Sequence, residues 1–180
     1  MSRLQAIKEH PAFRTWSLMP QMVCHQAGWW ACVVWMGWLG PAVMLGFLFI
    51  HIRMVREHWR TEMVLILLST VLGIGLDNTL AGLGLVTYVG DQLVGLVPLW
   101  LVAIWAGFGA TLRHSQQVFV QRLPNAVLTG VLGGPMAYWG GEKLERLTIH
   151  GIEGWLAVSI LWGLALLILY WATRRQTESI

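Results

Sequence analysis

Six stretches of the chain are almost entirely apolar, and short polar segments separate them. An apolar run of about 18 residues or more is typical of a helix that crosses a membrane. The pattern therefore predicts an all-α, polytopic membrane protein, a bundle of six transmembrane helices. The predicted spans are residues 19–37, 41–57, 63–86, 96–113, 124–142 and 154–172. Together they form one transmembrane domain, 19–172, between a basic tail at 1–18 and a second tail at 173–180.

The first two predicted spans are separated by the sequence GWLGP, residues 37–41. Glycine and proline favour a tight turn, and a proline inside a helix removes a backbone hydrogen bond. A single helix over 19–54 would be about 54 Å long, whereas the apolar core of a bilayer is about 30 Å thick. We therefore predict a hairpin of two short helices here.

Basic residues predict the orientation of the bundle. With six spans, all but two of the twelve Lys and Arg residues fall on one side of the membrane. Lys143 and Arg146 fall on the other side, where Glu142, Glu145 and Glu153 accompany them. The positive-inside rule then places both the amino and the carboxyl terminus in the cytoplasm.

Composition supports the membrane prediction and excludes several function classes. The chain is 56% hydrophobic and 12% charged, whereas about a quarter of the residues of a soluble protein are charged. The net charge of +3 comes from basic residues beside the spans, so the expected partners are membrane lipids and not nucleic acid. The sequence contains no H-E-x-x-H, no G-x-S-x-G and no phosphate-binding glycine loop.

One face of the third predicted span carries only small and polar side chains. Ser69, Gly73, Asp77 and Ala81 follow at four-residue steps, which places them on one helical face. Small residues let helix backbones approach closely in a membrane, so this face predicts helix packing. The fifth span carries a comparable G-x-x-x-G pattern at 130–134, and the proline that follows is expected to bend it.

Asp77 is the only charged residue predicted deep in the bilayer. Counting about 1.5 Å per residue along each span brings Asp77 and Tyr138 to the same depth, about 21 Å from the cytoplasmic side. We hypothesise an interior polar layer of Asp77, Asn78, Tyr138 and Trp105, with Glu142 near its mouth. No Lys or Arg is predicted at this depth, so the neutral acid is expected. Two roles stay open for Asp77, a structural hydrogen bond or a part in proton transfer or ligand binding.

The first predicted span presents polar groups of its own. His25, Trp29 and Cys32 share one helical face, and Gln26 lies on the next. The candidate ligand-binding residues are therefore Gln26, Trp29, Cys32, Asn78, Trp105 and Glu142. The candidate catalytic residues are Asp77 and Tyr138.

No cofactor and no metal is expected. His25 and His51 come to similar depths, about 9 Å from the cytoplasmic side, which raises the question of a haem between two histidines. Tightly joined helices pack about 8–10 Å apart, too close to admit a macrocycle. Cys24 has no further ligands at the spacing of a zinc site. His114, next to Ser115 at a span end, is expected in a solvated loop.

Several motifs resemble those of one family, in order and in spacing. They are QAGWWACV at 26–33, LGIGLDN at 72–78, PLWLVAIWAGFGATL at 98–112 and GGPMAYWGGEKL at 133–144. Over about residues 20–172 the chain is similar to an uncharacterised family of small bacterial inner-membrane proteins, domain of unknown function 2878. The resemblance implies a multi-pass protein of the bacterial inner membrane and lends no activity. Members are often encoded near cyclopropane fatty-acyl synthases, which implies a lipid-modifying membrane partner.

Two functions follow as hypotheses. The first is a non-enzymatic accessory protein or small transport-like bundle whose interior polar layer either stabilises packing or holds a lipid or small solute. The second is an intramembrane enzyme or enzyme subunit in fatty-acyl or lipid modification, with Asp77 transferring a proton and Tyr138 as its partner. Neither a substrate nor an oligomeric state follows from the sequence.

Overall fold

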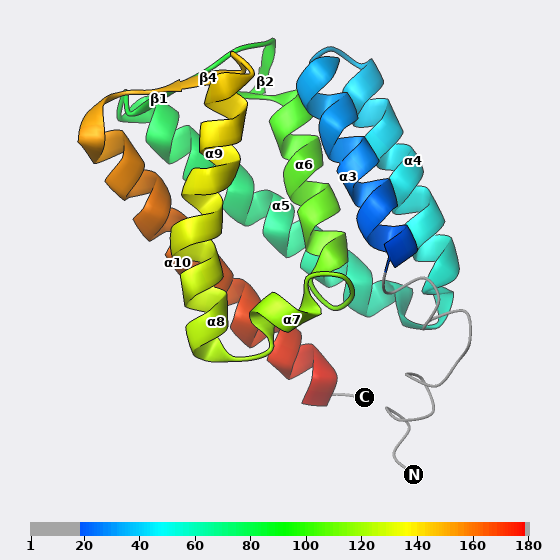
Figure 1. The fold of residues 1–180 in the computed structure, drawn as a ribbon. Helices are drawn as coiled ribbons and strands as arrows, with labels where there is room; N and C mark the ends of the chain where they lie inside the picture. Colours follow the sequence, from blue (N-terminus) through cyan, green and yellow to red (C-terminus); the bar gives the residue numbers. More distant parts are fainter. Residues whose placement is uncertain (1–18, 179–180) are drawn as a thin grey trace.

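The computed structural model describes residues 19–178, which form a mostly helical structure (Figure 1). The main helices coincide with the six apolar stretches, and their ends shift by a few residues. The predicted basic tail at 1–18 and the last two residues of the predicted tail at 173–180 lie outside the described residues.

A hairpin of two helices begins the described part, as predicted. Helix α3 (Met19–Val34) and helix α4 (Leu39–Met54) lie side by side (Figure 1). In the turn between them the N–H of Gly40 donates to the carbonyl of Trp35 at 3.1 Å. A Cβ at Gly40 would lie 2.6 Å from the Cα of Cys32, so the close approach of the two helices requires glycine there.

Helix α5 (Trp59–Gly82) follows the short 3-10 helix η1 (Arg56–His58) and packs against α6 (Leu99–Thr111). The small-residue face predicted for this helix is its contact with α6. A Cβ at Gly73 would lie 2.1 Å from the ring of Trp105, and a Cβ at Gly109 would lie 2.8 Å from the Cα of Ile66. Gly109 therefore permits a close approach of the two backbones, and Gly73 leaves space for the Trp105 ring.

The fifth apolar stretch is helical but irregular. It comprises α8 (Leu123–Leu128), a π-helical turn η2 (Thr129–Gly133) and α9 (Gly134–Lys143), after the short helix α7 (Gln117–Val120). Pro135 has no N–H to donate to the preceding turn, and the π-helical turn accommodates the break in the hydrogen-bond ladder. The G-x-x-x-G pattern packs on the last helix, α10 (Gly151–Glu178), because Gly130 and Gly134 both lie against Trp162.

The prediction of helices alone was incomplete, because two pairs of short strands lie at one end of the bundle (Figure 1). Strand β1 (Val86–Tyr88) pairs antiparallel with β4 (Leu147–Ile149), and β2 (Gln92–Val94) pairs with β3 (Val97–Pro98). The predicted span 63–86 therefore ends too late. In β1 and β4 a threonine stands between two apolar residues, so the apolar side chains face the bundle and the threonines face outward.

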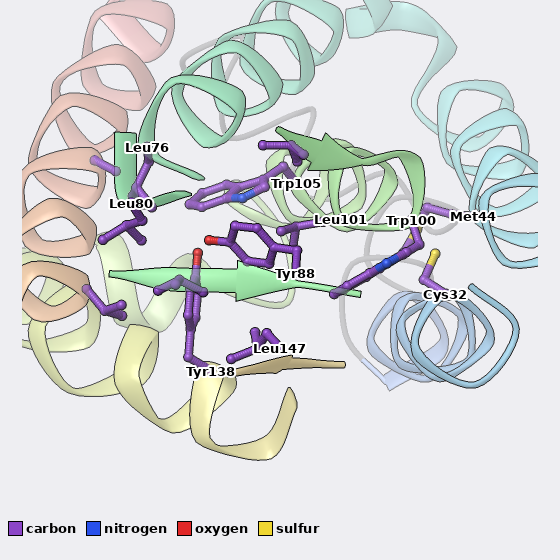
Figure 2. Packing of buried hydrophobic residues seen from close by; sticks show 14 of the residues in the cluster. Cys32, Met44, Leu76, Leu80, Tyr88, Trp100, Leu101, Trp105, Tyr138 and Leu147 are labelled. Carbon is purple, nitrogen blue, oxygen red and sulfur yellow. The ribbon is translucent and has the colours of Figure 1, made fainter. Parts of the chain in front are cut away.

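Within residues 19–178, two helical segments, Arg56–Gly82 and Gly151–Arg175, are long and apolar enough to cross a membrane. Leu39–Met54 and Leu99–Thr111 are apolar but shorter. A large core cluster lies beneath the strands and between the helices, and Figure 2 shows part of it around Trp105, Tyr88 and Tyr138.

Candidate functional site

Asp77 is fully buried at the centre of a group of hydrogen-bond donors. Its Oδ1 accepts a hydrogen bond from the hydroxyl of Tyr88 at 2.7 Å and another from the hydroxyl of Tyr138. Its Oδ2 accepts from Nε1 of Trp105 at 2.8 Å. We call these four residues the Asp77 cluster. They come from α5, β1, α9 and α6, and Figure 2 shows the two tyrosine hydroxyls meeting beside the Trp105 ring.

Local sequence explains how this cluster forms. Gly73, one turn before Asp77, leaves space for the indole of Trp105 against α5. Ser69, a further turn back, donates through Oγ to the carbonyl of Trp105 at 2.9 Å and so holds α6 in register with α5. Tyr88 points inward because it alternates with the exposed Thr87 along β1.

All three partners of Asp77 are neutral donors. No Lys, Arg or His forms an ion pair with Asp77 within the described part of the chain. Burial raises the pKa of Tyr88 above its ordinary value, so its hydroxyl stays protonated and donates. Both carboxyl oxygens are thus satisfied by hydrogen bonds rather than by a counter-ion.

A cavity of about 320 Å³ lies beside the Asp77 cluster, between α3, α6, α9 with its π-helical turn, and α10. Trp105 and Tyr138 belong to its wall, whereas Asp77 and Tyr88 lie behind them. Its other aromatic lining residues are Trp29, Trp100, Phe108 and Trp162. Exposed residues on both sides, Gln26 of α3 and Ala137 of α9, also line it. The cavity therefore opens sideways between α3 and α9.

Two buried nitrogens of the cavity wall lack a hydrogen bond. Nε2 of His25 and Nε1 of Trp162 have no acceptor or donor of ordinary geometry among the described residues. The indole of Trp162 stacks on Trp105 with ring centroids 4.4 Å apart. Buried polar atoms normally have partners, so these two nitrogens point to a bound molecule or water in the cavity.

A second buried polar group lies at the opposite end from the strands, and we call it the Glu62 network. Glu62 accepts hydrogen bonds from Nε2 of His114 at 3.2 Å and from Arg113 at 3.3 Å, and its Oε2 lies 3.4 Å from Nε2 of His51. Gln21 reaches the same group, with its Nε2 3.3 Å from Nδ1 of His51. Glu62, His51, His114 and Gln21 are all buried.

The hydrogen bonds of Gln21 assign the proton on His51. The N–H of Ser115 donates to Oε1 of Gln21 at 3.0 Å, and Nε2 of Gln21 donates to the carbonyl of Ala110 at 2.8 Å. The amide orientation is therefore determined, and its NH₂ faces Nδ1 of His51. Nδ1 must accept, so the proton of His51 lies on Nε2 and faces Glu62.

The proton on Nε2 of His51 disfavours metal binding at the Glu62 network. The ligand atoms of His51, Glu62 and His114 lie within 4.8 Å of one another, close enough for a shared ion. A protonated Nε2 cannot coordinate a metal. For the proton to move to Nδ1, the Gln21 amide would have to turn over and lose its hydrogen bonds with Ala110 and Ser115. Arg113 also supplies positive charge to Glu62 already. The residues fit a hydrogen-bonded ionic network better than a metal site.

Comparison with known proteins identifies the family. Residues 18–168 match the family described as protein of unknown function, DUF2878. The chain belongs to this family. No curated protein and no solved structure matches the chain. Because the match begins before Gln21 and ends after Leu166, the family region contains the Asp77 cluster, the cavity and the Glu62 network.

Within this family region, the structure brings together only part of the predicted polar layer. Asp77, Tyr138 and Trp105 meet. Asn78 faces elsewhere and holds the β2–β3 pair, because its Oδ1 accepts from the N–H of Leu96 at 2.8 Å. Glu142 accepts from the N–H of Ile149 at 2.9 Å and does not line the cavity.

The polar residues predicted on the first span also separate. Gln26, Trp29 and His25 line the cavity, whereas Cys32 is fully buried in the core. The ring of Phe47 packs against both His25 and His51, at 5.8 and 6.0 Å between centroids. The two histidines nevertheless belong to different environments, because His25 lines the cavity and His51 contacts Glu62.

Sequence reasoning missed Tyr88 and most of the Glu62 network. Tyr88 follows the predicted end of a span, and only the alternation of apolar residues with threonine in V-T-Y could have shown that it faces inward. His114, expected in a solvated loop, is 4% exposed. Glu62 and Gln21 lie near span ends, where charged and polar residues are ordinary, so no local signal distinguishes them.

Proposed function

We propose that this protein is a multi-pass protein of the bacterial inner membrane that binds a lipid or small apolar solute in the cavity between α3 and α9, without catalysing a reaction. It would cross the membrane six times, with both termini cytoplasmic. The observation that carries the proposal is the sideways opening of an aromatic-lined cavity, since such cavities suit apolar ligands.

The distribution of apolar side chains supports membrane insertion. Large apolar residues are exposed in rows along the outer faces of the helices, and buried positions include Glu62, Asp77 and His51. Examples from four helices are Leu45, Phe49, Leu67, Val71, Leu132, Met136, Ile160 and Leu164. A water-soluble protein rarely exposes so much contiguous apolar surface, whereas in lipid such a surface is the favourable one.

The positions of basic residues support the orientation. Arg53, Arg60, Arg113 and Arg174 lie at helix ends or connections away from the strands, the lower end in Figure 1. Lys143 lies at the strand end. The positive-inside rule assigns the strand end to the outer side.

A cavity-filling variant tests the binding proposal. Ala137→Trp places an indole on the cavity wall, and Met136→Trp places the same group on the neighbouring outward position, which is 70% exposed. Both variants would be purified in detergent from bacterial membranes, and native mass spectrometry would count the lipids retained. Wild type and Met136→Trp should retain a tightly held lipid that Ala137→Trp loses. Equal retention by all three would contradict the proposal.

An intramembrane enzyme is the second candidate function, and one observation favours it. Tyr138 donates its hydroxyl hydrogen bond to Asp77 and also lines the cavity, so a proton from a ligand could pass through this hydroxyl to Asp77. Asp77→Asn separates the candidates, because the amide can hydrogen-bond but cannot exchange a proton at ordinary pH. Comparative lipidomics of cells carrying either form should show the same fatty-acyl profile if the protein only binds. A fatty-acyl change that appears in cells with the wild-type protein but not in cells with Asp77→Asn would favour the enzyme and a lipid-modifying role.

A further inference from the structure

The polar residues of the cavity wall gather at one end. His25 of α3, Thr129 of the π-helical turn and Gln116 after α6 lie toward the end away from the strands, with Gln26 beside them. The wall toward the strands consists of Val33, Leu101, Gly141 and Leu147 among others. From His25 to Val33 the cavity extends about 12 Å along α3.

The two ends also differ in how they close. At the strand end Nε of Arg146 donates to the carbonyl of Val33 at 2.6 Å, which joins the end of α3 to the segment that follows α9. Below this contact the cavity opens between the same two helices. An elongated ligand would therefore have its apolar end toward Arg146 and its polar end beside His25.

The lining limits the charge of that polar end. Among residues 19–178, no Asp, Glu, Lys or Arg lines the cavity. A charged headgroup placed against this wall would lose hydration and find no charged partner among the described lining residues. An uncharged head that both donates and accepts hydrogen bonds can bond to the buried Nε2 of His25 whichever tautomer the ring adopts. It can also bond to the side-chain amides of Gln26 and Gln116.

From these features we infer that the ligand is an uncharged single-chain lipid with a hydroxyl-bearing head, of the monoacylglycerol class. Its head lies beside His25 and Gln116, and its chain runs toward Leu147. A cavity of about 320 Å³ is at the small end of ligand sites, which suits one chain rather than two. This inference rests on the proposed function, because it names the ligand of the same cavity.

The test uses the full chain purified in detergent and two probes, 1-monooleoylglycerol and oleate, which share one acyl chain and differ in head charge. Native mass spectrometry would measure binding of each at pH 8. Wild type should prefer 1-monooleoylglycerol about tenfold. His25→Leu should lose most of this preference, whereas His25→Gln, which keeps hydrogen-bonding groups, should retain part of it. Melting temperatures would verify that each variant is folded.

A photoreactive group at the chain end of the monoacylglycerol tests the orientation. Crosslinks should form with residues 141–149 and not with 113–129. Crosslinks at the opposite end, equal binding of oleate, or an unchanged preference in folded His25→Leu would overturn the inference while leaving the cavity as a lipid site. Failure of both probes to bind, or equal binding to Ala137→Trp and Met136→Trp, would instead overturn the proposed function.

Discussion

At the scale of single residues, the structure changes the interpretation of Asp77. The acid was expected to be neutral because it has no counter-ion, yet the structure surrounds it with three donors. These donors need acceptor oxygens on Asp77, so the residue holds Tyr88, Tyr138 and Trp105 in place whether or not a proton moves. When Asp77 is substituted, the main expected effect is therefore that these three donors lose their acceptor.

Asp77→Leu tests this role. It leaves three buried donors without an acceptor, and each such donor costs about 1–3 kcal/mol. We expect the free energy of unfolding to fall by about 3 kcal/mol or more, and Asp77→Asn, which keeps one oxygen, to lower it by less. Thermal unfolding in detergent provides the measurement. Asp91→Asn, the same change at an exposed acid, should have little effect. A leucine variant as stable as wild type would refute the role.

Gly73 and Gly75 provide a matched pair on one helix. A Cβ at Gly73 would lie 2.1 Å from Trp105, whereas one at Gly75 would meet nothing within 4 Å. Gly73→Ala should displace Trp105 and lower the free energy of unfolding by about 1–3 kcal/mol. Gly75→Ala should be neutral or stabilise by up to about 1 kcal/mol, because alanine is the better helix former. The two melting temperatures should therefore move apart, and similar values would contradict the packing.

At the scale of elements, short polar contacts join helices that are far apart in the sequence. Gln21 links the beginning of α3 to the end of α6 and to α4 through its contacts with Ala110, Ser115 and His51. The strands at the other end perform a similar task, since β1 carries Tyr88 to Asp77. Neither contact follows from the apolar pattern that predicts the helices.

Gln21→Glu should loosen the docking of α3. The carboxylate can still accept from Ser115, but its second oxygen would face the carbonyl of Ala110 and the accepting Nδ1 of His51. We expect a loss of about 1–3 kcal/mol and faster amide hydrogen exchange in α3, while α10 keeps its protection. Gln121→Glu, at an exposed position, is the control. Unchanged exchange in α3 would show that Gln21 does not anchor it.

At the scale of the whole molecule, the apolar outer surface predicts membrane insertion, and the basic residues at the end away from the strands predict the orientation. Thr148 lies exposed at the strand end, and Gln121 lies exposed in the α7–α8 connection at the opposite end. In a Cys24→Ala background, a membrane-impermeant maleimide should label Thr148→Cys in intact spheroplasts. Gln121→Cys should be labelled only after the membrane is opened. Labelling of both in intact spheroplasts would contradict the six-span orientation.

The family and the positions of the helices could be predicted from sequence, because both depend on local patterns. Apolar runs as long as these are typical of helices. The motifs LGIGLDN and GGPMAYWGG resemble the family, and both lie within the residues that match it. Depth counting also brought Asp77, Tyr138 and Trp105 together, since residues at equal heights in a bundle have a chance to meet. The same counting failed for Asn78, which lies at that height but points toward β2–β3.

By itself, then, the sequence determined the helices, their order and the family of this protein, and it predicts their orientation in a membrane. Only the tertiary structure decided which polar groups meet, because a hydrogen bond between Gln21 and Ala110 or between Glu62 and His114 depends on side-chain direction across segments that are distant in the chain. It also decided where space is left. The cavity exists because α3 and α9 stand apart on either side of α6, and no local pattern in either helix encodes that separation.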